Sequence, residues 1–282
     1  MQILRTTAEL RGWSRSARCA SSSIIGLVPT MGALHAGHAS LMRAARTKCT
    51  HVAVSLFVNP TQFGPGEDFG KYPRAFDADC ALAATEGAEV LFAPSVEELY
   101  PNGVGSTFVE VPALSERLDG ASRPGHFRGV ATVVAKLLIA AEPDLAFFGQ
   151  KDAAQVSVLR RMVGDLRLAT EIVVCPIVRD GDGLALSSRN AYLSTEERAQ
   201  ALTLSRAVRS VESLVAQGER RADALVAAAR KVFAAEREVR VDYIAIVDWG
   251  TLEAVEIVSP GNLFAVAAWV GSTRLIDNAI LN

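Results

Sequence analysis

The sequence predicts an α/β protein, with a Rossmann-like doubly wound parallel sheet and a smaller C-terminal α+β domain. Through the first two thirds of the chain, short continuous apolar runs alternate with helical patterns. This alternation is typical of parallel strands that are buried on both faces and joined by right-handed crossovers. After residue 178 the order changes to two long helices followed by three strands, which indicates an α+β unit. We therefore predict a Rossmann-like domain over 1–177 and an α+β lid domain over 178–282.

The predicted elements follow one another closely. Thr6 or Thr7 caps an amphipathic first helix, although the arginines of the first 23 residues also faintly resemble a targeting presequence. A polar, glycine-containing loop over 178–194 marks a hinge. The remaining elements are strands at 24–28, 51–58, 89–94, 144–149, 171–177, 239–248, 262–270 and 273–281, and helices at about 38–49, 74–87, 128–141, 152–166, 195–217 and 221–236.

Composition narrows the class of function. The chain has 282 residues, of which 50% are hydrophobic and 21% charged, as in an ordinary globular protein. A net charge of −2 gives no basic footprint for nucleic acid, and no apolar stretch reaches the length of a membrane span. The four cysteines are too scattered for a zinc cluster or a disulfide framework, which indicates a reducing cytoplasm. We expect small-molecule ligands.

The stretch PTMGALHAGH, residues 29–38, places two histidines three positions apart where the first strand leads into a helix. One alternative is a zinc site, but zinc would need further ligands that the motif lacks. The other is burial in the core, which is the usual place of a single histidine on an apolar face. The preferred interpretation is a nucleotide phosphate site. Backbone N–H groups at a helix start favour anions, Gly32 and Gly37 allow close approach, and the imidazoles can donate to a phosphoryl group.

Other polar loops follow equivalent strand ends. Asn59 and Gln62 could orient a small hydroxylated or carboxylated substrate. In FFGQKDAAQ, residues 147–155, Lys151 could neutralise phosphate oxygens and Asp152 could accept from ribose hydroxyls. Each is also compatible with an ordinary loop or helix start. Their common position at the carboxyl ends of strands favours one site.

Two further loops carry cations. ALSSRN, residues 185–190, offers two hydroxyls and a guanidinium, which suit a triphosphate clamp. SRPGHFRGV, residues 122–130, adds Arg123, His126 and Arg128, which as isolated residues are more typical of surface cations than of ligands.

Taken in order, these motifs resemble the successive signatures of the pantoate–β-alanine ligase (pantothenate synthetase) family. The similarity runs from about residue 1 to the end of the chain, including the closing TRLIDN. The HxGH element alone is shared with a wider nucleotidyltransferase superfamily, so the ordered set of motifs is more specific than that element. The resemblance implies that the opening helix belongs to the fold.

The resemblance implies an ATP-dependent ligase that condenses (R)-pantoate with β-alanine to give pantothenate, AMP and diphosphate through a pantoyl adenylate. It also implies Mg²⁺ and a cytoplasmic homodimer. The alternative is another HxGH-type nucleotidyltransferase, which would require a basic pocket for an acceptor phosphate. Asn59 and Gln62 do not form such a pocket.

By motif position, the resemblance makes His38 the catalytic residue and His35 a supporting nucleotide contact. Gln62 would contact pantoate and β-alanine, and Gln155 would hold pantoate. Ala36 stands where the family usually has an acid, and Gln150 where it often has glutamate. We expect these two differences to affect the stability of the loops rather than the activity. The implied ATP contacts are Met31, Gly32, Ala33, Leu34, His35, Ala36, Gly37, His38, Gly149, Gln150, Lys151, Asp152, Val178, Leu186, Ser187, Ser188 and Arg189; Asn59, Arg123 and His126 would be further contacts, and the metal ligands are left open.

Overall fold

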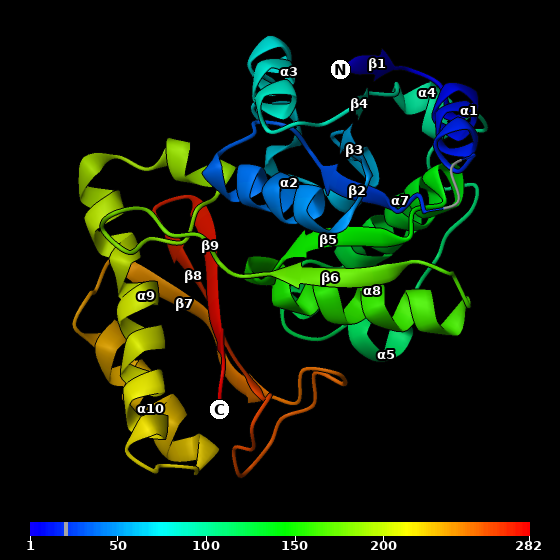
Figure 1. The fold of residues 1–282 in the computed structure, drawn as a ribbon. Coiled ribbons are helices and arrows are strands. Elements are labelled where there is room, and N and C mark those ends of the chain that lie inside the picture. Colours follow the sequence, from blue (N-terminus) through cyan, green and yellow to red (C-terminus); the bar gives the residue numbers. More distant parts are fainter. Residues whose placement is uncertain (20–21) are drawn as a thin grey trace.

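Six parallel strands form the larger of two sheets in the computed structural model, which describes residues 1–19 and 22–282 (Figure 1). Their order is β1-β4-β3-β2-β5-β6. The strands are β1 (Gln2–Leu4), β2 (Ile25–Thr30), β3 (His51–Leu56), β4 (Val90–Phe92), β5 (Leu145–Gly149) and β6 (Glu171–Cys175). This arrangement confirms the predicted doubly wound parallel sheet.

Helices cover both faces of this sheet. Helices α2 (Ala36–Lys48) and α3 (Phe76–Thr85) pack on one face, and α1 (Thr7–Ala17), α7 (His126–Ala141) and α8 (Ala153–Asp165) lie on the other. Successive strand residues serve opposite cores, since Leu27 packs with α7 and Val28 with α2. Short segments complete this part of the chain: α4 (Val96–Leu99), α5 (Pro112–Ser115), α6 (Asp119–Ser122), η1 (Pro60–Gln62), η2 (Asp68–Gly70) and η3 (Gln150–Asp152).

The C-terminal part forms a three-stranded antiparallel sheet with two helices on one side (Figure 1). Its elements are η4 (Ser188–Tyr192), α9 (Thr195–Ala216), α10 (Ala222–Ala234), β7 (Val239–Val247), β8 (Leu263–Val270) and β9 (Thr273–Ile280). This sheet confirms the predicted α+β class. Val247, Leu252 and Leu263 also join the core beneath α7 and α8, so the two parts share apolar packing. The domain boundary between 177 and 178 stays a prediction.

The predicted elements are found, with differences at their ends. Thr6 and Glu9 form a capping box that starts α1, as the threonine predicted. Strand β1 was not predicted, because three residues are too few to show a period. Helix α2 begins at Ala36 rather than 38, and α7 at His126 rather than 128. The loop 178–194 is more regular than predicted, with a bridge between Arg179 and Ala185 and the short helix η4.

The strand order creates one crevice of functional interest. From β2 the chain builds outward through β3 and β4, then returns to place β5 on the other side of β2. In such sheets the ligand site lies outside the carboxyl ends of the strands where the order reverses. The turn after Thr30 and the turn after Gly149 meet there. Within the described residues, no helix is long and apolar enough to cross a membrane.

Candidate active site

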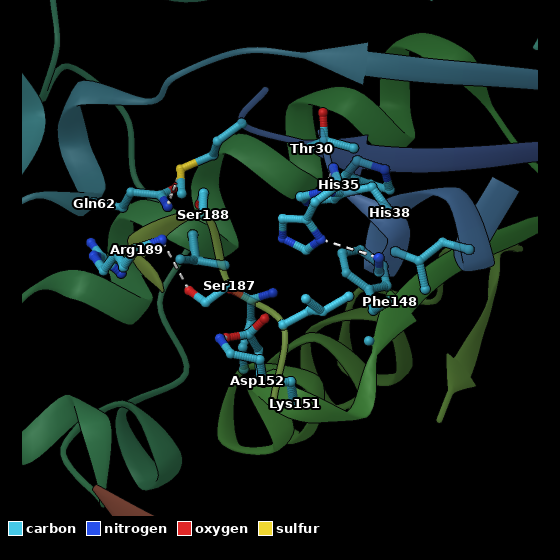
Figure 2. A pocket seen from close by; sticks show the side chains of 18 of the residues that line it. Thr30, His35, His38, Gln62, Phe148, Lys151, Asp152, Ser187, Ser188 and Arg189 are labelled. Carbon is cyan, nitrogen blue, oxygen red and sulfur yellow. Dashed lines mark hydrogen bonds and ion pairs between the residues drawn. The ribbon is translucent and has the colours of Figure 1, made fainter. Parts of the chain in front are cut away.

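A cavity of about 230 Å³ lies at the carboxyl ends of β2, β3, β5 and β6 (Figure 2). His35 comes from the turn after β2 and His38 from the first turn of α2, while η1 contributes Gln62 and η3 contributes Lys151. Residues 186–189 close the cavity from the C-terminal part. A second cavity of about 920 Å³ continues toward β9 and shares a wall with the first, formed by Arg123, His126, Lys151, Asp152, Gln155, Ser187 and Arg189.

The HxGH stretch is a helix capping box made of histidines. His35 is the N-cap of α2, and its Nδ1 accepts from the backbone N–H of Gly37 at 3.1 Å. In return, His38 Nδ1 accepts from the His35 backbone N–H at 3.3 Å. An N-cap and its N3 partner are three positions apart, which accounts for the spacing of the histidines. Both side chains therefore satisfy donors that the helix start would otherwise leave free.

These two hydrogen bonds fix the tautomer of both imidazoles. A neutral imidazole whose Nδ1 is an acceptor carries its proton on Nε2. Burial lowers the pKa of His35 to about 4, with Lys151 adding to the effect, and burial followed by the neighbouring His35 lowers the pKa of His38 to about 3. At neutral pH each ring is thus an uncharged Nε2–H donor. A ring held in this way is also a poor metal ligand, because Nε2 carries the proton and the lone pair of Nδ1 already accepts a backbone N–H.

Gly37 is required by the ring of His35. A Cβ at Gly37 would lie 2.8 Å from His35 Cε1 and 2.9 Å from Nδ1. The missing side chain therefore makes room for the capping imidazole. Gly37 also lines the cavity, so its backbone is accessible to a ligand, as the sequence predicts.

The turn that precedes the histidines is held by a buried carboxylate. Asp79 of α3 is 2% exposed, and its oxygens accept from the backbone N–H groups of Ala33 at 3.0 Å and Leu34 at 2.7 Å. Gly32 and Ala33 both adopt positive φ, at 81° and 49°. Asp79 stabilises this strained turn. Sequence reasoning missed Asp79, because it lies inside a helix 46 positions from its partner and no local pattern marks it.

Two arginines of the cleft are paired with carboxylates from one loop, residues 63–74. Arg189 donates to Asp68 through Nε at 3.0 Å and Nη2 at 2.9 Å, and Arg123 donates to Glu67 through Nε at 2.8 Å and Nη2 at 2.7 Å. Burial alone would raise the pKa of Glu67, but the Arg123 guanidinium outweighs it and lowers that pKa to about 2. The Tyr72 hydroxyl lies 3.0 Å from Ser188 Oγ and joins the same loop to η4.

His126 is a third histidine with a defined tautomer. Its Nδ1 lies 2.8 Å from the carbonyl oxygen of Gln62, and Arg123 Nη1 lies 2.9 Å from its Nε2. Because a carbonyl can only accept and a guanidinium can only donate, the proton is on Nδ1. Burial, followed by the adjacent Arg123 charge, lowers the pKa of His126 to about 4. This ring therefore connects Arg123 to the Gln62 backbone.

The end of the cavity near Gln62 is mainly apolar. Gln62 is 8% exposed; its Oε1 accepts from Asn59 Nδ2 at 3.2 Å and its Nε2 lies 2.9 Å from Met31 Sδ. Asn59 is only 1% exposed and also donates to the carbonyl of Gly129 at 3.1 Å. Asn59 therefore supports Gln62 from behind instead of lining the cavity. The apolar surface comes from Phe57, Val130, Val133, Val134, Leu137 and Phe148.

The cavity brings together most of the residues proposed from sequence. Those that line it are Met31, His35, Gly37, His38, Gln62, Gly149, Lys151, Asp152, Gln155, Val178, Leu186, Ser187, Ser188 and Arg189, together with Arg123 and His126. Gly32, Ala33, Leu34, Ala36 and Gln150 are not among the lining residues. The first three form the turn on Asp79, and the Gln150 side chain instead donates to Asn278 Oδ1 at 3.2 Å. Ala36 is exposed at the start of α2.

Tyr72 and Phe148 also line the cavity, but they do not belong to the set predicted from sequence. Tyr72 lies in a loop with few pattern cues, and Phe148 lies inside an apolar strand. Among the residues that the structure describes, no cluster of three or more histidines, cysteines or acids could hold a metal ion.

The sequence and the fold were compared with those of known proteins. The family model for pantoate-beta-alanine ligase matches residues 2–280. The pantothenate synthetase of Acidobacterium capsulatum is 64% identical over 257 residues, covering 91% of this chain and 86% of that protein. The crystal structure of pantothenate synthetase from Thermus thermophilus superposes with a TM-score of 0.93 at 45% identity, covering 99% of each chain.

A second similar solved structure is a complex with ligands. It is the pantoate-beta-alanine ligase from Francisella tularensis complexed with beta-gamma ATP and beta-alanine, with a TM-score of 0.81 at 33% identity, covering 99% of this chain and 97% of that one. The family match extends over nearly the whole chain, including the turns that build the cavity. The chain therefore belongs to the pantoate–β-alanine ligase family.

Proposed function

We infer that this protein is a pantoate–β-alanine ligase, which joins the pantoate carboxylate to the β-alanine amine using ATP and releases AMP and diphosphate. One observation carries the inference. A single cavity at the switch point combines neutral imidazole donors, Lys151 and the 186–189 segment with an amide-bearing apolar end. The first group of residues suits a nucleotide triphosphate, and the second suits a small hydroxy acid with a dimethyl carbon, such as pantoate.

The donors define the end that would hold the nucleotide. We propose that the Nε2–H groups of His35 and His38 donate to phosphate oxygens, with His38 acting on the phosphoryl group that reacts. Lys151 would neutralise phosphate charge, while Ser187, Ser188 and Arg189 would clamp the distal phosphates. The other ATP contacts proposed from sequence are the backbone segments 31–38, 149–152, Val178 and Leu186. Gly32, Ala33, Leu34, Ala36 and Gln150 would act by shaping these segments.

The acid substrate would occupy the opposite end. Gln62 has a fixed amide, because Asn59 holds its Oε1. Gln155 lines both cavities and faces this region from α8. The pantoate dimethyl group would pack on the apolar surface of α7, and the two amides would bind its hydroxyl and carboxylate groups.

In the first step, a pantoate carboxylate oxygen attacks the α-phosphorus of ATP and forms a new P–O bond. The bond from that phosphorus to the bridging oxygen breaks, and diphosphate leaves with the electron pair. Charge spreads over the phosphoryl oxygens during this transfer, so fixed donors at His38 and Lys151 stabilise the transition state more than the ground state. No enzyme nucleophile is required.

In the second step, the neutral amine of β-alanine attacks the acyl carbon of pantoyl adenylate. The C–O bond to AMP breaks and AMP leaves with the electron pair, while the amine nitrogen loses one proton to water. The second cavity, which joins the first at Arg123 and His126, gives β-alanine an approach to Gln62. Alignment of the two reactants is the main contribution required of the protein.

We propose that Mg²⁺ enters as the ATP complex. Mg²⁺ usually keeps several waters and is held by substrate phosphates with one or two carboxylates. The cavity contains Asp152 and the hydroxyls of Ser187 and Ser188, which suit such a weakly held ion. When bound, the ion would neutralise charge on the leaving diphosphate.

We further propose that the protein is a cytoplasmic homodimer. The four free cysteines suit a reducing compartment. The dimer rests on the family resemblance alone. Light scattering of the purified protein would test it, and a monomer at micromolar concentration would contradict it.

The activity test supplies ATP, Mg²⁺, pantoate and β-alanine. We expect stoichiometric AMP and pantothenate, and pantoate-dependent exchange of labelled diphosphate into ATP when β-alanine is omitted. Product formation without exchange would contradict a released-diphosphate adenylate step. The other HxGH-type nucleotidyltransferase activity is not favoured, because the family match covers residues 2–280 rather than the HxGH segment alone. Transfer of AMP to a phosphorylated acceptor would overturn that choice.

A further inference from the structure

Strand β9 brings two buried polar side chains against the segments that would bind ATP. Asp277 and Asn278 are 2% and 4% exposed, and they pair with Val266 and Ala265 of β8. Successive residues of a strand point to opposite faces. The two side chains can therefore hold different segments on either side of β9, which contacts η3.

Asn278 holds the turn that carries Lys151. Its Nδ2 donates to the carbonyl of Gln150 at 3.0 Å and to the carbonyl of Lys151 at 2.9 Å. Its Oδ1 accepts from Gln150 Nε2 at 3.2 Å. The two N–H groups and the oxygen of the Asn278 amide are thus all hydrogen-bonded to Gln150 or Lys151. This fixes the peptide plane from which the Lys151 side chain leaves.

Asp277 holds the base of the segment that carries Arg189. Its oxygens accept from Arg179 Nη1 at 2.7 Å and Nη2 at 2.9 Å, and Nη1 also donates to the carbonyl of Gly183 at 3.1 Å. Arg179 bridges to Ala185 across this hairpin. The guanidinium therefore ties both arms of the hairpin to β9, and residues 186–189 continue directly from it to the cavity.

We propose that Asp277 and Asn278 are positioning residues that set the two nucleotide segments, 149–152 and 178–189, at their working separation. This inference rests on the proposed function. The two segments follow different strands of the large sheet, and β9 joins them through adjacent side chains. Neither residue lines the first cavity, and Asp277 lines only the second, so toward the nucleotide they act through Lys151 and Arg189. Misplacement by about 1 Å can cost up to about a hundredfold in rate.

The first test replaces Asn278 by alanine and measures kcat/KM for ATP in the diphosphate exchange. Asn262→Ala is the matched control, because Asn262 is also buried, at 7% exposed, and its Oδ1 accepts from the Ser259 N–H at 2.7 Å in the loop before β8, away from η3. We expect kcat/KM for ATP to fall by about tenfold or more in Asn278→Ala only. Equal losses in the two variants would overturn the proposal.

A double-variant cycle separates positioning from a general loss of stability. If Asn278 acts through Lys151, Lys151→Ala combined with Asn278→Ala should be no slower than Lys151→Ala alone. If the two substitutions lower kcat/KM independently, so that their fold-losses multiply in the double variant, Asn278 has a general structural role and the proposal is overturned. If Lys151→Ala keeps the wild-type kcat/KM for ATP, the proposed nucleotide site itself is wrong and the inference falls with it.

Asp277→Asn gives a second, gentler test that preserves shape. It should lower kcat/KM for ATP, and its effect should disappear in an Arg189→Ala background. This cycle decides the matter if Asn278→Ala does not fold. An Asp277→Asn enzyme with wild-type kcat/KM for ATP would remove Asp277 from the proposal.

Discussion

The two walls of the cavity differ in whether their hydrogen-bond donors are free to bind a ligand. On the wall of the large sheet, His35 and His38 are uncharged donors that the helix cap fixes before any ligand arrives. On the facing wall, Arg189 and Arg123 are already paired with Asp68 and Glu67. The first wall is preorganised and needs no rearrangement. The second must exchange a carboxylate for a phosphate or another anion before it can bind one.

Replacing His38 should produce the largest loss. His38→Asn keeps an acceptor near the position of Nδ1 and so preserves the cap, but it removes the Nε2–H donor. We expect kcat of the diphosphate exchange to fall by about 100- to 1000-fold, as for loss of one preorganised donor. His38→Gln places an amide nearer Nε2 and should recover part of the rate. Equal activity in both variants would show that the donor at Nε2 is not what His38 supplies.

Gly129→Ala should break the support behind Gln62. A Cβ there would lie 2.3 Å from the Thr61 carbonyl oxygen and 2.7 Å from Gln62 Cα, and both are backbone atoms. We expect KM for pantoate to rise by about tenfold, with a loss of about 1–3 kcal/mol in stability from overpacking. KM for ATP should change little.

Gly164→Ala is the control for that variant. A Cβ at Gly164 would meet nothing within 4 Å, and the residue lies in the last turn of α8. Steady-state kinetics and urea unfolding of both variants provide the comparison. A normal KM for pantoate in folded Gly129→Ala would argue against Gln62 as a pantoate contact.

Asp68→Asn should strengthen nucleotide binding, because it releases Arg189 from its carboxylate partner. A partly exposed ion pair contributes little, so we expect Kd for ATP to fall by only about two- to fivefold. Arg189→Ala should act in the opposite direction. Asp165→Asn, at the exposed end of α8, is the control for removal of one negative charge. Weaker ATP binding by Asp68→Asn in calorimetry would show that this carboxylate assists the nucleotide rather than competing with it.

Local sequence patterns predicted the preorganised wall better than the paired one. Periodicity located the strand ends, and the HxGH motif lies where a strand meets a helix, so His35 and His38 could be assigned to one site. The reason for their spacing, a capping box, became visible only with the backbone geometry. The pairs of Arg189 with Asp68 and of Arg123 with Glu67 join residues 121 and 56 positions apart. No local pattern encodes such contacts.

The contribution of the C-terminal sheet was equally hidden. TRLIDN carried a family resemblance, but nothing in it indicated that Asn278 would bond to the Gln150 and Lys151 carbonyls. Likewise, the sequence predicts Asn59 as a ligand contact, but the fold buries it behind Gln62. Tertiary packing determines which polar residues of a loop face the ligand and which support those that do.

The smallest expected effects concern protonation. The pKa values of His35, His38 and His126 lie at about 4, 3 and 4, below the ordinary 6.5. Nitrogen-15 NMR at neutral pH should therefore show three neutral rings, with the proton on Nε2 in His35 and His38 and on Nδ1 in His126. A charged ring, or the same tautomer in all three, would contradict the contrast between the capped pair and the arginine-linked ring.

The same shifts set the sign of a pH effect on stability. Because the folded pKa values are lowered, the unfolded chain binds protons more tightly between about pH 4 and 6.5, so stability falls as pH decreases through that range. The contribution of these histidines is fully present above about pH 6.5 and is lost as the pH passes the folded values near 4 and 3. Urea unfolding at about pH 7.5 and 5.5 should show a smaller decrease in His38→Gln than in the wild type, since glutamine cannot take up that proton. An identical decrease would mean that His38 titrates alike in the folded and unfolded chains, and the fixed neutral donor would lose its support.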